Sequence, residues 1–294
     1  MENFSNVKVI AQKEFTDHLK SPVFLSFTAT FTLVVLAWSY VQGTEVEYTL
    51  NVLGSPDIMR GFKGVAEVVG CFAPIIGIVL GFDAIVKEIR SSSMNVLLTH
   101  PVFRDNIILG KILGSGSCIL LVLFFSINLA TGVMLMASGL PITMQQIIRI
   151  EMFVFLTFFY ALIFLAISIM ISTIAKKSNN SFLFNLIFWL VITVLLAKLI
   201  FTVSYAFSED LNIANSQTQT IKNFLPDYHF SVTAVGIKDI NTGLTSGIGG
   251  IFDTRYTLGA WAGEFWPNLA YLFVLPFILL IGSILAFLKK DITY

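Results

Sequence analysis

Few residues in this sequence have the types and spacing that chemistry in a protein site requires. The pair in Gly110-Lys111-Ile112 has neither the earlier glycine nor the Ser or Thr of a phosphate-binding GxxxxGK[ST] loop. The three histidines, His18, His100 and His229, are far apart, and none has a second metal ligand at helical spacing. HExxH, GxSxG and paired intramembrane aspartates are absent. We therefore expect a chain that is not an enzyme and that binds no metal and no cofactor itself.

Polar residues within apolar segments are the next candidates, because ionisable groups in a membrane span often serve a substrate path. Glu67 lies about one turn inside the second apolar segment, and Lys198 about two turns from the end of the fifth. Both side chains could reach the headgroup region by snorkelling, or could pair with each other. Asn128, Thr131 and Ser168 could line a path, although hydrogen bonding between helices explains them equally well. Structural roles are the favoured interpretation, and all five residues are weak candidates for a substrate path.

The segment from Asp83 to Asp105 combines two kinds of side chain that no single solvent satisfies. Charged residues alternate with large apolar ones over about the length of a short helix. Pro101 disfavours helix at the preceding residue, so one helix should end near Thr99 and a second should begin near Pro101. A segment that carries both charged and large apolar side chains favours contact with another protein. We predict a short helix across the membrane face, followed by a corner.

Composition places these residues in an all-α polytopic membrane protein. The 294 residues are 56% hydrophobic and 12% charged, whereas soluble domains carry about 25% charged residues. Six apolar segments are long enough to cross a bilayer, which takes about 20 residues of helix. They are residues 22–42, 65–82, 112–137, 152–175, 181–206 and 265–288. Residues 1–21 read as an amphipathic helix in the membrane interface, and the chain 1–294 as a single membrane domain.

Lysine and arginine set the expected orientation in the cell (plasma) membrane. With the amino terminus inside, the inner segments hold Lys8, Lys13, Lys20, Lys87, Arg90, Arg104, Lys111, Lys176, Lys177, Lys289 and Lys290. The outer segments hold Arg60, Lys63, Arg149, Lys222, Lys238 and Arg255. This bias predicts that both termini and residues 83–111 are cytoplasmic, and that residues 207–264 form a long external loop. Whether that loop is a subdomain or flexible is left open, but Ile221 to Val235 has enough apolar residues to suggest partial burial.

The polar segment also carries a resemblance to a known family. Glu88, Leu97-Leu98, Pro101-Val102, Arg104 and Gly110-Lys111 resemble the first cytoplasmic loop of ATP-binding-cassette (ABC) permeases of the type-2 exporter family. Ser92-Ser93 departs from the Gly-Thr that is usual there. The amino-terminal Lys13-Glu14-Phe15 and Lys20-Ser21-Pro22 are similar to that family's entry helix. The layout of spans is similar to the branch that includes permeases associated with copper-enzyme maturation.

The resemblance implies a function and a set of partners. Such a permease pairs with a second permease, identical or related, and with ABC ATPase subunits that bind ATP and Mg. A coupling helix after the second span docks on the ATPase, with apolar residues in a cleft and charges at its rim. The residues expected to couple to the ATPase are Glu88, Ile89, Arg90, Met94, Leu97, Leu98, Pro101 and Arg104.

Two other classes of function remain open on the residues alone. A self-sufficient secondary carrier, channel or membrane-embedded enzyme would need a polar constellation at mid-bilayer, and the third and fourth spans offer only Ser, Thr and Asn. A membrane scaffold would recruit soluble partners through residues 83–105 without moving a substrate. The formal net charge of zero gives no reason to expect nucleic acid as a partner. The identity of the cargo is left open.

Overall fold

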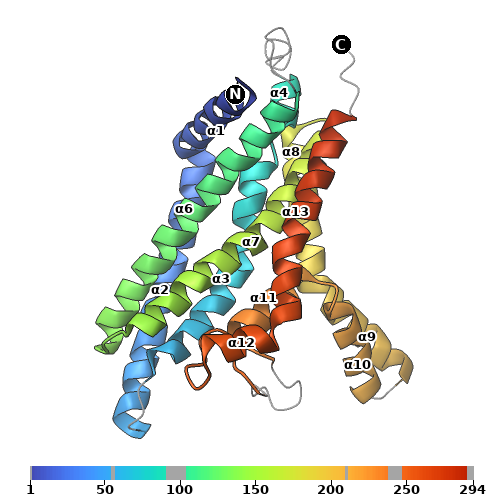
Figure 1. Ribbon diagram of the computed structural model, residues 1–294. Helices are drawn as coiled ribbons and strands as arrows, with labels where there is room; N and C mark the ends of the chain where they lie inside the picture. The colour runs from blue at the N-terminus through green and yellow to red at the C-terminus, as the bar shows by residue number, and fades with distance from the viewer. Residues whose placement is uncertain (1, 54–56, 91–103, 209–210, 238–246, 290–294) are drawn as a thin grey trace.

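The fold is a bundle of long helices, seen in a computed structural model that describes residues 2–53, 57–90, 104–208, 211–237 and 247–289 (Figure 1). No strand occurs in these ranges. Six helices or helix runs are long and apolar enough to cross a membrane. The predicted fold class, all-α with six spans, is confirmed to this extent.

The spans follow the order of the chain. They are α2 (Pro22–Leu53), α3 (Ile58–Gly81), α6 (Arg104–Ser138), α7 (Met144–Ile174), α8 (Ser178–Trp189) with the π-helical turn η1 (Leu190–Leu195) and α9 (Leu196–Ser208), and α13 (Trp266–Leu288). The shorter helices are α1 (Glu2–Lys20), α4 (Val86–Arg90), α10 (Leu211–Lys222), α11 (Pro226–Val235) and α12 (Leu258–Glu264). Several spans extend beyond the apolar segments that the sequence marks, because helix continues through polar residues such as Glu45 and Glu47.

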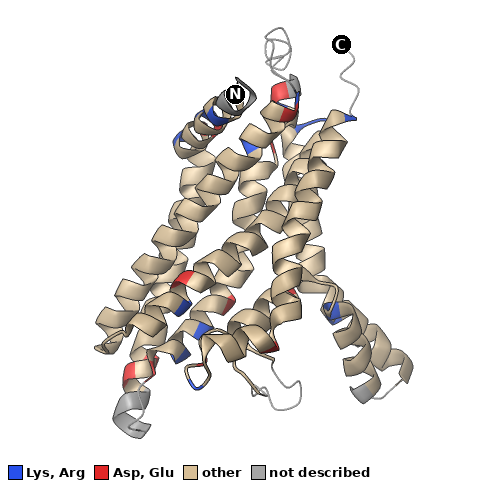
Figure 2. Cartoon of the chain, viewed as in Figure 1, with Lys and Arg blue, Asp and Glu red and all other residues tan. Residues whose placement is uncertain are grey.

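The two ends of the bundle differ in what they carry (Figure 1). One end, called the α4 end below, holds α1, α4 and the last turn of α13. The opposite end, called the α11 end, holds α10, α11 and α12. Charged residues lie toward these two ends and leave the middle of the bundle apolar (Figure 2). This distribution is what a bilayer requires, because a charge at its centre is costly.

Glycines allow the helices to approach closely at particular points. A Cβ on Gly77 of α3 would meet the backbone of α7, 2.5 Å from the oxygen of Ala161. A Cβ on Gly114 of α6 would meet α1, 2.7 Å from the oxygen of Ala11. A Cβ on Gly116, by contrast, would have room, because its nearest neighbour, Leu162, would lie 3.8 Å away, an ordinary contact distance. The small-residue faces seen in the sequence therefore serve helix packing, except at Gly116.

Helix α1 lies beside the first half of α6 (Figure 1). Phe15 and Leu19 are partly buried against the core, while Lys8, Lys13 and Lys20 are exposed. The predicted position of this helix in the headgroup plane stays a prediction. What the structure adds is that α1 is also packed against a span, which ties its movement to α6.

The region expected to be a long loop is largely helical where it is described. Helix α11 packs against α3, α7 and α13, and buries Phe230, Val232 and Val235. The indole Nε1 of Trp261 donates to the oxygen of Thr233 at 3.0 Å. The burial expected within residues 221–235 is therefore present, and it lies in α11.

An arginine holds the segment that follows α11. The Arg149 guanidinium, at the start of α7, donates to the oxygens of Ile251 and Tyr256, both at 2.5 Å. Asp253 accepts from Arg255 at 2.7 Å and from the N–H of Gly249 at 2.8 Å. The hydrogen bonds from Arg255 are the main reason why the pKa of Asp253 is well below its usual value. The Arg149 guanidinium thus supplies donors to two backbone oxygens, those of Ile251 and Tyr256, that would otherwise lack them.

Candidate functional site

The predicted coupling segment begins at the turn between α3 and α4, and two serines of α7 hold that turn. The Ser172 hydroxyl accepts hydrogen bonds from the N–H groups of Ile85 at 3.1 Å and Val86 at 3.2 Å. These N–H groups lie at the start of α4, where the first N–H groups of a helix have no acceptor within the helix. About one turn earlier in α7, Ser168 donates to the oxygen of Ile78 in α3 at 3.2 Å. The base of the segment is therefore fixed to the last turns of α7.

A buried lysine joins the three elements that meet beside this turn. Lys111 of α6 is 4% exposed, and its Nζ donates to Glu14 of α1 at 2.6 Å and to Glu88 of α4 at 3.0 Å. Glu14 and Glu88 are themselves largely buried. An ion pair of this kind holds its partners in register, because removing one member leaves a charge buried without compensation. The amino-terminal helix and the root of the coupling segment are thus bound to the same cation.

His18 completes this cluster on the side of α1. Its Nε2 lies 3.1 Å from the hydroxyl of Ser115 and 3.9 Å from Glu14. Burial lowers the pKa of His18 below its ordinary value, although Glu14 and Asp83 act in the opposite direction. The imidazole is therefore neutral at pH 7, and its contact with Glu14 is not an ion pair there. A cavity of about 280 Å³ lies between these residues and Lys87.

Two side chains predicted to couple to the ATPase can be placed. Glu88 binds Lys111, as described, and Arg104 begins α6, with its guanidinium carbon 5.6 Å from the ring centre of Phe287 at the end of α13. Ile89 and Arg90 belong to α4, but only their backbone is described. Met94, Leu97, Leu98 and Pro101 lie outside the described residues. The structure brings Glu88 and the start of α6 to one end of the bundle with α1 (Figure 1).

Glu14 and Lys111 both belong to the motifs seen in the sequence, but no contact between them was predicted. The signal that could have paired them is the isolation of Lys111, which has no acidic residue one turn before or after it, at 107, 108, 114 or 115. A lysine buried in such a helix needs a counterion from another element. Only tertiary contact identifies that element as α1 together with α4.

The weak candidates for a substrate path are scattered over the bundle. Asn128 and Thr131 of α6 donate to oxygens of their own helix, those of Phe124 and Ile127. Ser168 binds α3, as above, and Lys198 is exposed on α9. Glu67, also exposed, lines a cavity near the α11 end. The structure does not bring these five residues together at one place.

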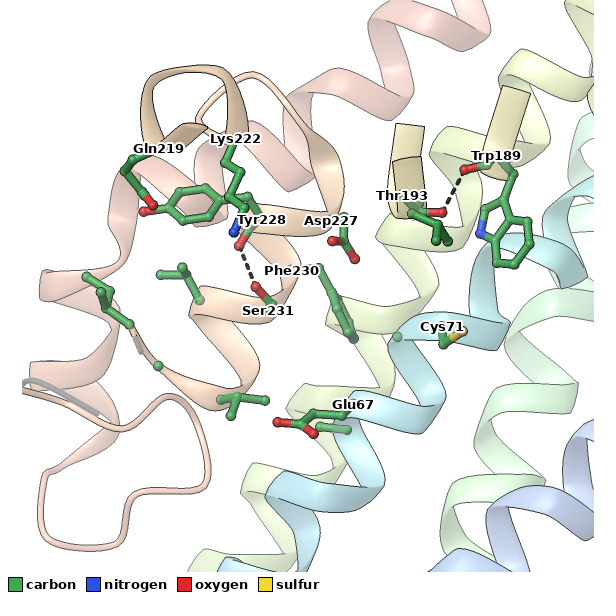
Figure 3. Close-up of a pocket in the computed structure, with 17 residues that line it drawn as sticks. Glu67, Cys71, Trp189, Thr193, Gln219, Lys222, Asp227, Tyr228, Phe230 and Ser231 are labelled. Carbon is green, nitrogen blue, oxygen red and sulfur yellow. Dashed lines mark hydrogen bonds between the residues drawn. The ribbon is translucent and has the colours of Figure 1, made fainter. Parts of the chain in front are cut away.

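A cavity of about 400 Å³ lies beside Glu67 near the α11 end (Figure 3). Its walls come from five elements: Glu67 and Cys71 of α3, Trp189 of α8, the η1 turn, Lys222 of α10, and α11. From α11 it receives Asp227, Tyr228, Phe230 and Ser231. Volumes of this size are typical of small-molecule sites.

Within the described residues no group of His, Cys, Asp and Glu side chains is suited to hold a metal ion. Cys71 and Cys118 are both free, and Cys118 is buried within α6. The feature that distinguishes the described residues is the polar cluster of Lys111, Glu14 and Glu88 at the α4 end of an apolar bundle.

Comparison with known proteins identifies the family. The model of the family described as "ABC-2 family transporter protein" matches residues 8–292, which is nearly the whole chain. The chain belongs to the ABC-2 family. The predicted family is confirmed, and with it the membrane-protein fold class that the six spans indicate.

Two curated relatives that match the chain share one name. The chain is 26% identical over 136 residues to a "Probable ABC transporter permease protein NosY" of Stutzerimonas stutzeri, covering 46% of this chain and 48% of the relative. It is 31% identical over 112 residues to a protein of that name from Pseudomonas aeruginosa, covering 37% of this chain and 38% of the relative. The chain thus spans about half the length, or less, of these two relatives.

Proposed function

We propose that this chain is the membrane-spanning permease subunit of an ABC exporter, forms the translocation path, and is driven by ATP hydrolysis in a separate ATPase chain. ATP and Mg then bind to the ATPase and not to this chain. Both termini and residues 83–111 face the cytoplasm, where the ATPase is. Residues 83–105 are the segment on which the ATPase docks.

The observation that carries this proposal is the junction at Lys111, where this lysine of α6 pairs with Glu14 of α1 and Glu88 of α4. A motor that acts on residues 83–105 has to move the spans, so its contact point needs rigid attachment to them. Lys111 binds α4 to α6 and α1, and Ser172 binds the turn before α4 to α7. Ser168 in turn binds α7 to α3. Packed helices transmit force as rigid bodies. The family match over residues 8–292 supports the same mechanism.

The fifth span supports pairing with a second permease, identical or related. Its outward-facing residues are large and apolar, and they make little contact with the rest of the chain; they include Leu190, Val191, Val194, Leu195, Leu199 and Val203. In a membrane such a face is covered either by lipid or by another protein. A path between two permeases would place it beside the partner.

Affinity purification of the full chain from membranes of its own host tests the proposal. We expect a protein with a GxxxxGK[ST] loop to co-purify in stoichiometric amount and to hydrolyse ATP. The substitution Leu97→Asp, on the predicted docking segment, should leave membrane insertion intact and abolish co-purification of the ATPase, because a charge in an apolar cleft is left unpaired.

A matched substitution separates docking from general damage. Phe224→Asp places the same charge on an exposed aromatic residue between α10 and α11, at the other end of the bundle, and should leave co-purification unchanged. Recovery of the ATPase in equal amount with Leu97→Asp would contradict the docking assignment. Transport by the purified chain in vesicles without any ATPase would show a self-sufficient carrier instead.

A further inference from the structure

The cavity near the α11 end has a distinctive balance of charge. Two carboxylates, Glu67 and Asp227, and one ammonium group, Lys222, line it (Figure 3). At neutral pH their formal sum is one negative charge. Asp227 is partly buried, and its carboxylate accepts a 3.4 Å hydrogen bond from Tyr160. Burial raises the pKa of Asp227, and a cation beside it would favour the charged form.

Aromatic rings surround the same cavity. Trp189, Tyr228 and Phe230 line it from two elements, and Figure 3 shows the indole of Trp189 with its nitrogen on the side of Asp227 and Phe230. That indole Nε1 is buried without a hydrogen-bond partner among the described residues. Ring faces attract cations, and tryptophan does so most strongly. Aromatic faces combined with carboxylates are the usual means of binding an organic ammonium group.

The wall beside Trp189 is irregular, which gives the cavity room. The π-helical turn Leu190–Leu195 follows Trp189 directly, and Thr193 and Val194 of that turn line the cavity. Single π-helical turns occur frequently at functional sites. On the opposite wall, a Cβ on Gly70 would lie 2.7 Å from the ring of Phe230, so glycine at this position lets the ring approach α3 closely.

The lining selects among kinds of ligand. A metal ion is not favoured, because the described acidic, cysteine and histidine side chains form no group suited to one. An anion would meet two carboxylates and one ammonium group. An organic cation with apolar substituents satisfies both the net charge and the aromatic walls.

We propose that the cavity between α3, η1 and α11 is a binding site for a singly charged amphipathic organic cation, held by Glu67, Asp227 and the ring of Trp189. The site lies near the α11 end, far from the junction at Lys111 (Figure 1). The proposal concerns binding alone, goes beyond the proposed function, and stands whether or not the bound molecule is the one transported.

Binding of tetraphenylphosphonium to the full chain, purified in uncharged detergent without ATP, tests the proposal. Tetraphenylborate has the same shape and the opposite charge, and serves as the matched ligand. We expect the cation to bind, to quench tryptophan fluorescence, and to bind at least about tenfold more tightly than the anion. The quench should disappear in Trp189→Phe, although the chain has three other tryptophans.

Charge variants on the cavity wall should move the affinity in opposite directions, as measured by equilibrium dialysis. Asp227→Asn and Glu67→Gln should weaken binding of the cation, and Lys222→Met should strengthen it. Glu67 is exposed, so its variant is expected to fold even where Asp227→Asn does not. Glu151→Gln removes a carboxylate of α7 that does not line the cavity, and should leave the affinity unchanged. Equal binding of the anion, or unchanged cation affinity in Glu67→Gln, would overturn the proposal.

Discussion

At the scale of single residues, the molecule depends on one cation placed where lipid and protein exclude water. Lys111 is satisfied by Glu14 and Glu88, neither of which is near it in the chain. Buried ion pairs add little net stability over an apolar replacement, but removing one member is costly. The cluster positions α1 and α4 relative to α6, because Lys111 pairs with one carboxylate from each of them.

Replacing Lys111 with methionine should therefore lower the free energy of unfolding in detergent micelles by about 3–5 kcal/mol. The loss arises because Glu14 and Glu88 are left buried without a counterion. Lys8→Met, which removes an exposed lysine of α1, should change stability by less than about 0.5 kcal/mol.

The triple variant Lys111→Met, Glu14→Gln, Glu88→Gln distinguishes charge compensation from simple packing. Because no uncompensated charge remains, it should recover most of the stability that Lys111→Met loses. If the triple variant is as unstable as the single one, the cluster contributes through shape rather than through charge.

At the scale of elements, the close packing of α1 against α6 requires glycine, which has no side chain, at position 114. A Cβ on Gly114 would lie 2.7 Å from the oxygen of Ala11, 2.8 Å from the Cβ of Glu14 and 3.2 Å from the nitrogen of Phe15. Two of these atoms are backbone, so α1 itself would have to move. Gly116, two residues later in the same helix, offers a matched control, because its Cβ would meet only Leu162 at 3.8 Å.

We expect Gly114→Ala to destabilise the protein by about 1–3 kcal/mol, through overpacking and displacement of α1. Gly116→Ala should be neutral or stabilising by up to about 1 kcal/mol, because alanine favours helix over glycine. Thermal unfolding in detergent measures both, and limited proteolysis of α1 reports its displacement. Equal behaviour of the two variants would mean that α1 is not packed against α6 at this point.

At the scale of the whole molecule, the orientation in the membrane decides whether the proposed mechanism can operate. An even number of spans places α1 and the end of α13 on the same side, as Figure 1 shows for the α4 end. The distribution of lysine and arginine predicts that this side is the cytoplasm. An ATPase reaches residues 83–105 only there.

Labelling of introduced cysteines tests this orientation. In a variant with Cys71 and Cys118 replaced by serine and alanine, Ser92→Cys should react with an impermeant maleimide only after the membrane is opened. Thr254→Cys, exposed near the α11 end, should react in intact cells. The reverse pattern would place the predicted docking segment outside the cell and end the proposed coupling to ATP.

The sequence by itself determined the class of the molecule. Its runs of apolar residues are long enough for six spans, and this signal is local, so it needs no tertiary information. The motif around Glu88 and Gly110-Lys111 was likewise readable as a resemblance to the family that the comparison identifies. Metal-binding and phosphate-binding motifs are defined by the spacing of a few residue types, so their absence can be read from the sequence without a structure.

Only the tertiary structure decided which polar residues meet. Glu14 and Lys111 are 97 residues apart, and Glu67 and Asp227 are brought to one cavity from α3 and α11. The helical form of the region after the fifth span was also not predicted, because its polar composition resembles a loop, and α11 is stabilised by packing against three spans. Local patterns specify segments that cross the membrane, whereas the contacts between segments depend on how the faces of several helices fit together.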